Sequence, residues 1–188
     1  MNLRLIAPTL ALAALASAQT AQAQQQACVA AADLGDAVVY AMPIAFDAAR
    51  TACANRLTNN GFMATGGEDF IATFRGGQDK AWPGAFRLLK TFMADDANAV
   101  GGANADMGAM LTALPEDALR PFVDGLVGQM IAGEIKGESC SKIERGLALI
   151  APLPPENVGG LFAFIAEIAD LKSPPICGSA QPSVNARK

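Results

Sequence analysis

The chain has 188 residues, of which 52% are hydrophobic and 17% charged, with a formal net charge of −4 and no histidine. Its acidic balance and scattered basic residues exclude a basic surface for nucleic acid or for anionic lipid headgroups. The absence of histidine excludes Ser–His and Cys–His nucleophile pairs and removes the commonest general base near neutral pH. We therefore expect a protein that is not an enzyme, that needs no cofactor and that binds no nucleic acid.

The N-terminal segment 1–23 is typical of an export signal. One positive charge at Arg4 precedes a largely apolar run over 5–15, and both 16–18 and 21–23 satisfy the small-x-small rule for cleavage. The second site is favoured because a run of glutamines expected to be exposed follows it. The apolar run is about half of the roughly 20 apolar residues that a membrane-spanning helix needs, so we expect no transmembrane segment after cleavage. Cleavage before Gln24 leaves 13 basic and 18 acidic residues, a net charge of −5. The sequence predicts a periplasmic or secreted protein.

Four cysteines follow this leader: Cys28, Cys53, Cys140 and Cys177. In an exported chain they predict two structural disulfides, and their spacings match no redox or zinc motif. Three pairings are possible. The order along the chain favours Cys28 with Cys53 and Cys140 with Cys177, so that each bridge closes one helical hairpin.

The first predicted hairpin covers 28–57. Leu34 and Phe46 belong to two different apolar stripes at helical spacing, and Pro43 lies between the stripes. One straight helix would hold the first two cysteines about 37 Å apart, beyond the reach of about 7 Å that a disulfide allows between Cα atoms. We therefore predict that the chain turns near Pro43.

The next stretch predicts two helices and two loops. A short helix is expected over 68–74, a loop over 75–79, and a helix that begins at Pro83 in its first turn and ends near 95. The polar segment 94–105, rich in Asp, Asn and Gly, predicts a mobile loop between the two halves of the chain.

The second half is helical in pattern. Apolar stripes at helical spacing predict helices over 107–114, 119–131, 141–150 and 156–171. Ser141 and Glu144 have the spacing of a capping box at the start of the third of these helices. The last helix has apolar residues on more than one face, which is normally the mark of a central helix. Antiparallel packing of the last two helices around their proline-rich connection would bring Cys140 and Cys177 together.

No segment alternates between apolar and polar residues over a useful length, so no strand is predicted. The chain is expected to be all-α: a single compact helical domain over 24–178, with about six to eight helices built from disulfide-stapled helical hairpins. The last residues, 179–188, are expected to form a disordered tail.

None of the candidate catalytic or metal-binding motifs in the sequence has the residues that its site requires. The adjacent carboxylates at 68–69, 95–96 and 116–117 point about 100° apart on a helix, and the helix dipole explains acids in a first turn. Ser139 and Lys142 match S-x-x-K but lack the partner motifs of that site. A calcium loop that starts at Asp96 would place a methionine where an acidic ligand is required.

Two function classes fit what remains. In the first, the protein is an interaction or structural module that binds an unknown protein partner through an apolar helix face and the loop over 94–105. The alternative is a carrier, in which the apolar helix faces near Phe122 and Phe162 line a cavity for a lipid or another hydrophobic small molecule.

Overall fold

The computed structural model describes residues 28–99, 115–169 and 174–177. These residues form six α-helices and one 3₁₀ turn, in this order: α2 (Ala31–Ala52), α3 (Phe62–Thr65), α4 (Gly67–Ala99), α6 (Glu116–Glu134), η1 (Gly137–Ser139), α7 (Cys140–Ile150) and α8 (Pro155–Ile168). The β-type pairing in these ranges is a single bridge between Val29 and Ile176. The prediction of an all-α domain is confirmed.

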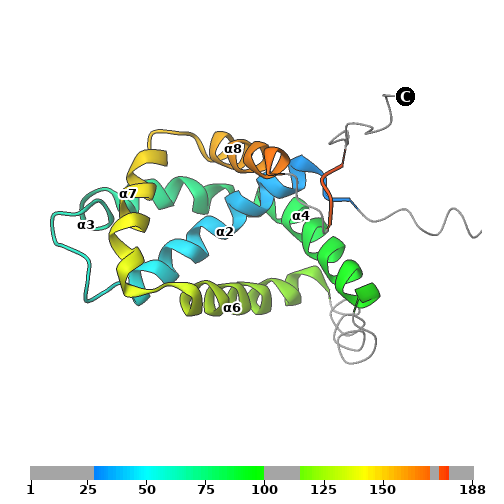
Figure 1. The fold of residues 1–188 in the computed structure, drawn as a ribbon, viewed down its shortest axis with the longest axis horizontal. Helices are drawn as coiled ribbons and strands as arrows, with labels where there is room; N and C mark the ends of the chain where they lie inside the picture. Colours follow the sequence, from blue (N-terminus) through cyan, green and yellow to red (C-terminus); the bar gives the residue numbers. More distant parts are fainter. Residues whose placement is uncertain (1–27, 100–114, 170–173, 178–188) are drawn as a thin grey trace, which may run out of the picture.

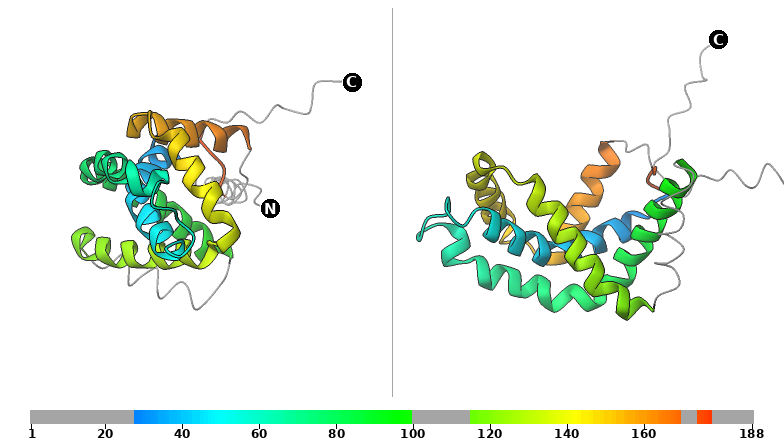
Figure 2. Two further views of the ribbon diagram at one scale, coloured as in Figure 1. Left: turned by 90° about the vertical axis from the view of Figure 1, so that its left-hand side faces the viewer. Right: turned by 90° about the horizontal axis from the view of Figure 1, so that it is seen from below.

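Helix α2 lies at the centre of the fold. Helices α4, α6 and α8 all pack against it, and α6 and α8 run along opposite sides of α2 (Figure 1). Helix α7 connects these two flanking helices at one end, as the views from the side and from below also show (Figure 2). The expectation that the last helix is the central one is wrong, because α8 packs by only one of its faces.

The core lies between α2 and α4. The largest fully buried side chains include Phe46 from α2 and Ile71 and Phe74 from α4. Phe70 contacts both Phe46 and Phe74, with ring centroids 6.5 Å and 5.0 Å away. These aromatic contacts fix the main helix pair of the fold.

The predicted turn at Pro43 is not found, because α2 continues from Ala31 to Ala52 with Pro43 inside it. A proline in a helix interior removes one hydrogen bond and costs about 3 kcal/mol. Pro43 and its neighbour Met42 are both buried, so packing against the rest of the core offsets that cost.

The loop expected over 75–79 is also helical, and α4 is continuous through it and through Pro83. Three polar side chains of this stretch have partners on other helices. Arg75 pairs with Asp47 at 3.1 Å, the Gln78 amide donates to the carbonyl oxygen of Tyr40 at 3.0 Å, and Asp79 pairs with Arg120. Contacts distant in sequence therefore override the local loop preference of two adjacent glycines.

Proline 83 lies in the interior of α4 rather than in a first turn, and the helix changes direction along its length (Figure 1). A helix-interior proline is a usual cause of such a bend. Helix α4 also continues to Ala99, so the first part of the predicted loop over 94–105 is helical. The rest of that loop lies outside the described residues, as do the leader over 1–23, the helix over 107–114 and the tail over 179–188.

Both predicted disulfide pairings are wrong. Cys28 bonds Cys177 and Cys53 bonds Cys140, with Cα–Cα distances of 5.0 Å and 5.7 Å. The physical reason is the continuity of α2, which keeps the first two cysteines at its opposite ends. Each bridge joins α2 to the second half of the chain, over sequence separations of 149 and 87 residues.

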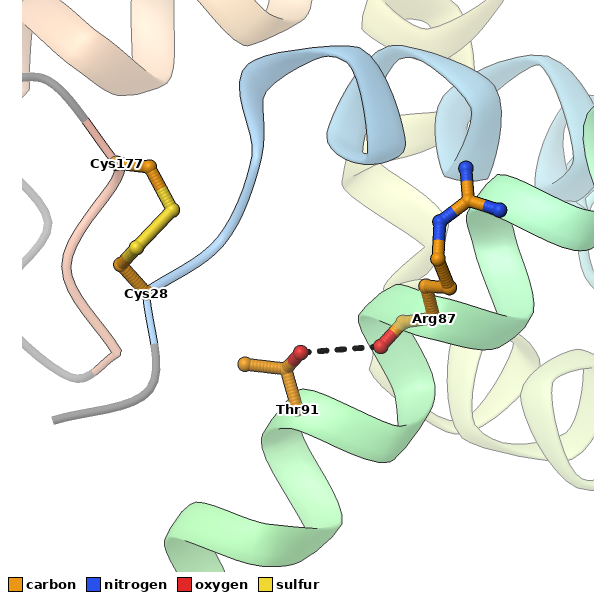
Figure 3. Close-up of a disulfide and its surroundings, with 4 residues drawn as sticks. All are labelled: Cys28, Arg87, Thr91 and Cys177. Atoms are coloured by element: carbon orange, nitrogen blue, oxygen red, sulfur yellow. Dashed lines mark hydrogen bonds between the residues drawn. A yellow bond between two sulfur atoms is a disulfide. The ribbon is translucent and has the colours of Figure 1, made fainter. Parts of the chain in front are cut away.

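The bridge between Cys28 and Cys177 is reinforced by the backbone. The Val29 N–H donates to Pro175 O and the Cys177 N–H donates to Val29 O, both at 2.8 Å. Figure 3 shows this bridge together with Arg87 and Thr91 of α4. The C-terminal described segment is thus held against the start of α2.

Two smaller expectations about the last helices are also wrong. Helices α7 and α8 meet at a bend of 117° instead of packing antiparallel. The predicted capping box does not form, since α7 begins at Cys140 without a side-chain cap. Glu144 instead accepts a hydrogen bond from the backbone N–H of Met63 at 3.1 Å, and so caps the start of α3.

Candidate functional site

The side of α8 that is turned away from α2 is apolar. On the opposite side of α8, which packs against α2, Val158, Gly159 and Ala163 are buried. Four apolar residues lie at positions i, i+3, i+4 and i+7 on the other side of the helix and are between 41% and 67% exposed: Leu161, Phe164, Ile165 and Ile168. We call these four residues the α8 face.

Helix α6 exposes a second, narrower set of apolar side chains. Phe122, Leu126 and Met130 lie four residues apart and are 51%, 47% and 64% exposed. The neighbouring Leu119 is buried. Monomeric soluble proteins rarely leave contiguous apolar patches uncovered, so α6 and α8 are both candidates for contact with a partner.

A cavity of about 170 Å³ lies between α2, α4 and α6. Its lining is almost entirely apolar and includes these residues: Ala37, Tyr40, Ala41, Ile44, Trp82, Ala85, Leu88, Leu89, Phe92, Val123 and Val127. The sequence placed such a cavity at Phe122 and Phe162. Both of these side chains are about half exposed and neither lines this cavity.

A polar cluster surrounds the Tyr40 hydroxyl beside the cavity. The hydroxyl donates to the carboxylate of Asp124 and accepts a hydrogen bond from Nε of Arg120 at 3.2 Å. Burial, followed by the hydrogen bond to Asp124, raises the pKa of Tyr40 well above its usual value. Arg120 also pairs with Asp79 at 2.6 Å, so these four residues join α2, α4 and α6. The cluster is a structural junction, and it keeps the phenol protonated.

A more polar groove lies on the other side of α2, between α2, α4 and α8. It has a volume of about 670 Å³, and its lining combines several glycines with Asp36, Lys80 and Glu156. Burial, with a smaller contribution from Asp33, raises the pKa of Asp36, whereas Arg87 and Lys80 oppose that shift. The mixed charges do not select one class of ligand.

Of the adjacent carboxylates considered from the sequence, the structure describes the side chains of Glu68 and Asp69. Glu68 pairs with Arg50 and Arg75, and the hydrogen bond from Arg75 is the main reason why its pKa is lowered. Ser139 precedes α7 and Lys142 is exposed. Within the described ranges, no group of three or more Cys, Asp or Glu side chains could hold a metal ion.

The four cysteines take part in disulfides, so the described chain contains no free thiol. None of the described helices is by itself long and apolar enough to cross a membrane, although α7 with its preceding turn and α8 would together reach that length across their bend.

The apolar spacing near Pro83 indicates that Trp82 is buried, and the structure agrees, but no sequence signal singled out Tyr40. Tyr40 is the only tyrosine and Trp82 the only tryptophan in the chain, and their ring centroids lie 4.9 Å apart. Each of the two residues is buried on its own helix, Tyr40 on α2 and Trp82 on α4. The spacing of apolar residues along one helix does not reveal that the two rings touch. It also does not reveal which groups form hydrogen bonds with the Tyr40 hydroxyl.

Comparison of the chain with known protein families, curated proteins and solved structures gives no match.

Proposed function

We propose that this chain is an exported, non-enzymatic helical protein that binds a protein partner through the α8 face. The observation that carries the proposal is the exposure of four large apolar side chains at helical spacing on one side of α8. An amphipathic helix of a partner presents matching apolar residues at the same spacing. Export is supported by the two disulfides, because stable disulfides are rare in the cytosol.

Charge indicates the chemistry of this partner. Helix α8 contains Glu156 and Glu167 and no basic residue, and the leader-cleaved chain has a net charge of −5. A partner helix with lysines or arginines beside its apolar stripe would complement this surface. The same acidic balance disfavours an anionic membrane as the occupant of the α8 face. We therefore infer that the partner is a basic amphipathic helix.

The proposal is tested with two defined peptides. One is an amphipathic helix of leucine and lysine, and the other has glutamate at every lysine position. By calorimetry the lysine peptide should bind, the glutamate peptide should not, and added salt should weaken binding. The variant Phe164→Ser/Ile168→Ser should bind at least about tenfold more weakly, since it removes two large apolar contacts.

The matched control is Leu126→Ser/Met130→Ser on α6, which removes two side chains of similar exposure. It should bind the lysine peptide as the unchanged protein does. All four substituted side chains are exposed, so thermal unfolding should show that both variants remain folded. Equal losses in both variants, or no binding of the lysine peptide at all, would rule out the α8 face as the binding site.

A second candidate function, carriage of a small hydrophobic molecule, is favoured by a separate observation. The cavity between α2, α4 and α6 is apolar, and its volume of about 170 Å³ is comparable with that of an apolar cavity known to bind benzene, about 150 Å³. This site is built from helices other than α8, so the two candidate functions can be tested independently.

A further inference from the structure

The two disulfides differ in their exposure to solvent. Cys53 and Cys140 are only 1% and 2% exposed, whereas Cys28 and Cys177 are both exposed. The exposed bridge lies outside the helices, between the residue stretch before α2 and the C-terminal described segment (Figure 3). A thiol reduces a disulfide by direct attack on one of its sulfur atoms, so the rate depends on access to that atom. The Cys28–Cys177 bridge is open to such an attack, and the fold shields the other bridge.

The exposed bridge closes an anchor between two short segments, 28–29 and 174–177. Val29 and Ile176 are each 4% exposed, and two backbone hydrogen bonds of 2.8 Å join the two segments. These contacts do not involve the sulfur atoms. When the bridge opens, we therefore expect the anchor to loosen while the rest of the domain stays folded.

The anchor follows closely after α8, whose C-terminal end has few other contacts to hold it. The buried residues of α8 are Val158, Gly159 and Ala163, and residues 164–168 are exposed or only partly buried. Segments with few buried contacts open locally at a low cost in free energy. The start of α8 is held by its packing against α2, so its end depends on the anchor more than its start does.

We propose that the Cys28–Cys177 disulfide is a reversible redox clamp, which a dithiol reductant opens while the Cys53–Cys140 disulfide stays closed. A thiolate of the reductant attacks one exposed Sγ and forms a mixed disulfide, and the other cysteine leaves as a thiolate and takes up a proton. The second thiol of the reductant then displaces the remaining cysteine. The bridge gains two electrons and two protons, the reductant becomes a disulfide, and the end of α8 is loosened.

The clamp thereby controls the α8 face. Three of the four residues of this face, Phe164, Ile165 and Ile168, lie after the last buried residue of the helix. A partner that binds them after the clamp has opened must first order this end of α8, which costs binding free energy. This consequence rests on the proposed function, whereas the selective opening of the bridge does not.

The first test follows the reduction of the leader-cleaved, oxidised protein by dithiothreitol. Samples taken over time are alkylated in denaturant, so that burial hides no reduced thiol, and are mapped by mass spectrometry. Cys28 and Cys177 should be labelled at least about tenfold faster than Cys53 and Cys140, because the inner bridge is reached only when the core opens. Equal rates, or faster labelling of Cys53 and Cys140, overturn the proposal.

The second test measures hydrogen exchange of the protein before and after the selective reduction. The amides of residues 165–168 should exchange at least about tenfold faster in the reduced protein, and those of residues 158–163 should exchange as before. Reoxidation should restore the slow exchange, and Cys28→Ser/Cys177→Ser should exchange like the reduced protein without any reductant. Unchanged exchange of residues 165–168 after reduction overturns the action of the clamp on α8.

Calorimetry with the lysine peptide separates this proposal from the proposed function. The selectively reduced protein should bind the peptide at least about threefold more weakly than the oxidised protein. Equal affinities overturn the control of the α8 face by the clamp. If the peptide binds neither form, the proposed function fails, and the labelling and exchange results still decide whether the clamp exists.

Discussion

At the scale of single residues, Asp36 shows how packing turns an ordinary carboxylate into a destabilising one. It lies on α2 opposite Gly84 of α4, where a Cβ atom on the glycine would come within 2.6 Å of the Asp36 Cβ. Burial and the nearby Asp33 raise its pKa, and Arg87 and Lys80 only partly compensate. The folded state therefore favours the protonated form of Asp36.

This shift predicts a pH-dependent gain from Asp36→Asn. Because the folded pKa of Asp36 lies above the unfolded value of about 3.9, its ionisation disfavours the folded state as pH rises through the folded pKa. The neutral variant should therefore unfold at a higher temperature than the unchanged protein at pH 7. The gain should shrink as the pH falls and disappear below the unfolded pKa.

The matched control for this experiment is Asp33→Asn, one helical turn earlier. Asp33 forms a two-pronged ion pair with Arg87, with distances of 2.7 Å and 3.1 Å. Its replacement should lower the unfolding temperature at pH 7. A loss of stability in Asp36→Asn at pH 7, measured by thermal denaturation, would contradict the assignment of Asp36 as a destabilising charge.

At the scale of elements, α2 and α8 cross where Gly35 of α2 lies against Gly159 of α8. A Cβ on Gly159 would lie 2.5 Å from the carbonyl oxygen of Gly35 and 3.1 Å from its carbonyl carbon. These are backbone atoms, which cannot move aside without shifting a helix. Glycine at this position lets the two helices approach more closely than any side chain would allow.

The crossing predicts opposite effects for two adjacent substitutions. Gly159→Ala should destabilise the protein by about 2 kcal/mol, because the new methyl group overlaps the backbone of α2. Gly160→Ala should stabilise it by about 0.5–1 kcal/mol, since nothing lies within 4 Å of its Cβ position and alanine is the better helix former. Urea denaturation of both variants measures the difference. Equal changes in the free energy of unfolding for the two variants would contradict the close approach of α8 to α2 at Gly159.

The apolar stripes of two helices, α6 and α8, were predicted correctly from the sequence. The stripe of Val123 and Val127 was recognised as helical from spacing alone, and both residues line the cavity between α2, α4 and α6. The apolar residues on two sides of α8 were recognised as well. Spacing could not reveal that one of those sides stays exposed, because exposure depends on which helices lie next to it.

At the scale of the whole molecule, the two disulfides tie the ends of α2 to the second half of the chain. Loops of 87 and 149 residues reduce the entropy of the unfolded chain by amounts worth about 5 kcal/mol each in the loop-closure view. That contribution is comparable with the total stability of a small domain, about 5–15 kcal/mol. The helices α6, α7 and α8 are therefore held around α2 by covalent bonds as well as by packing.

This architecture gives a direct prediction for the protein purified after export. Its intact mass should correspond to a chain that begins at Gln24, and alkylation without reductant should label none of the four cysteines. Proteolysis without reduction should yield linked peptides that contain Cys28 with Cys177 and Cys53 with Cys140. A peptide that links Cys28 to Cys53 would contradict the fold, and an uncleaved chain with reduced thiols would contradict export.

The amino-acid sequence by itself determined the class of the fold. Periodicity and the absence of strand patterns were enough for the all-α prediction, because they are local properties of the chain. Tertiary structure decided the course of α2 through Pro43, the helical state of residues 75–79 and both disulfide pairings. It also decided where the cavity between α2, α4 and α6 lies. Each of these depends on contacts between residues far apart in sequence, whose energies exceed local preferences and which no local pattern records.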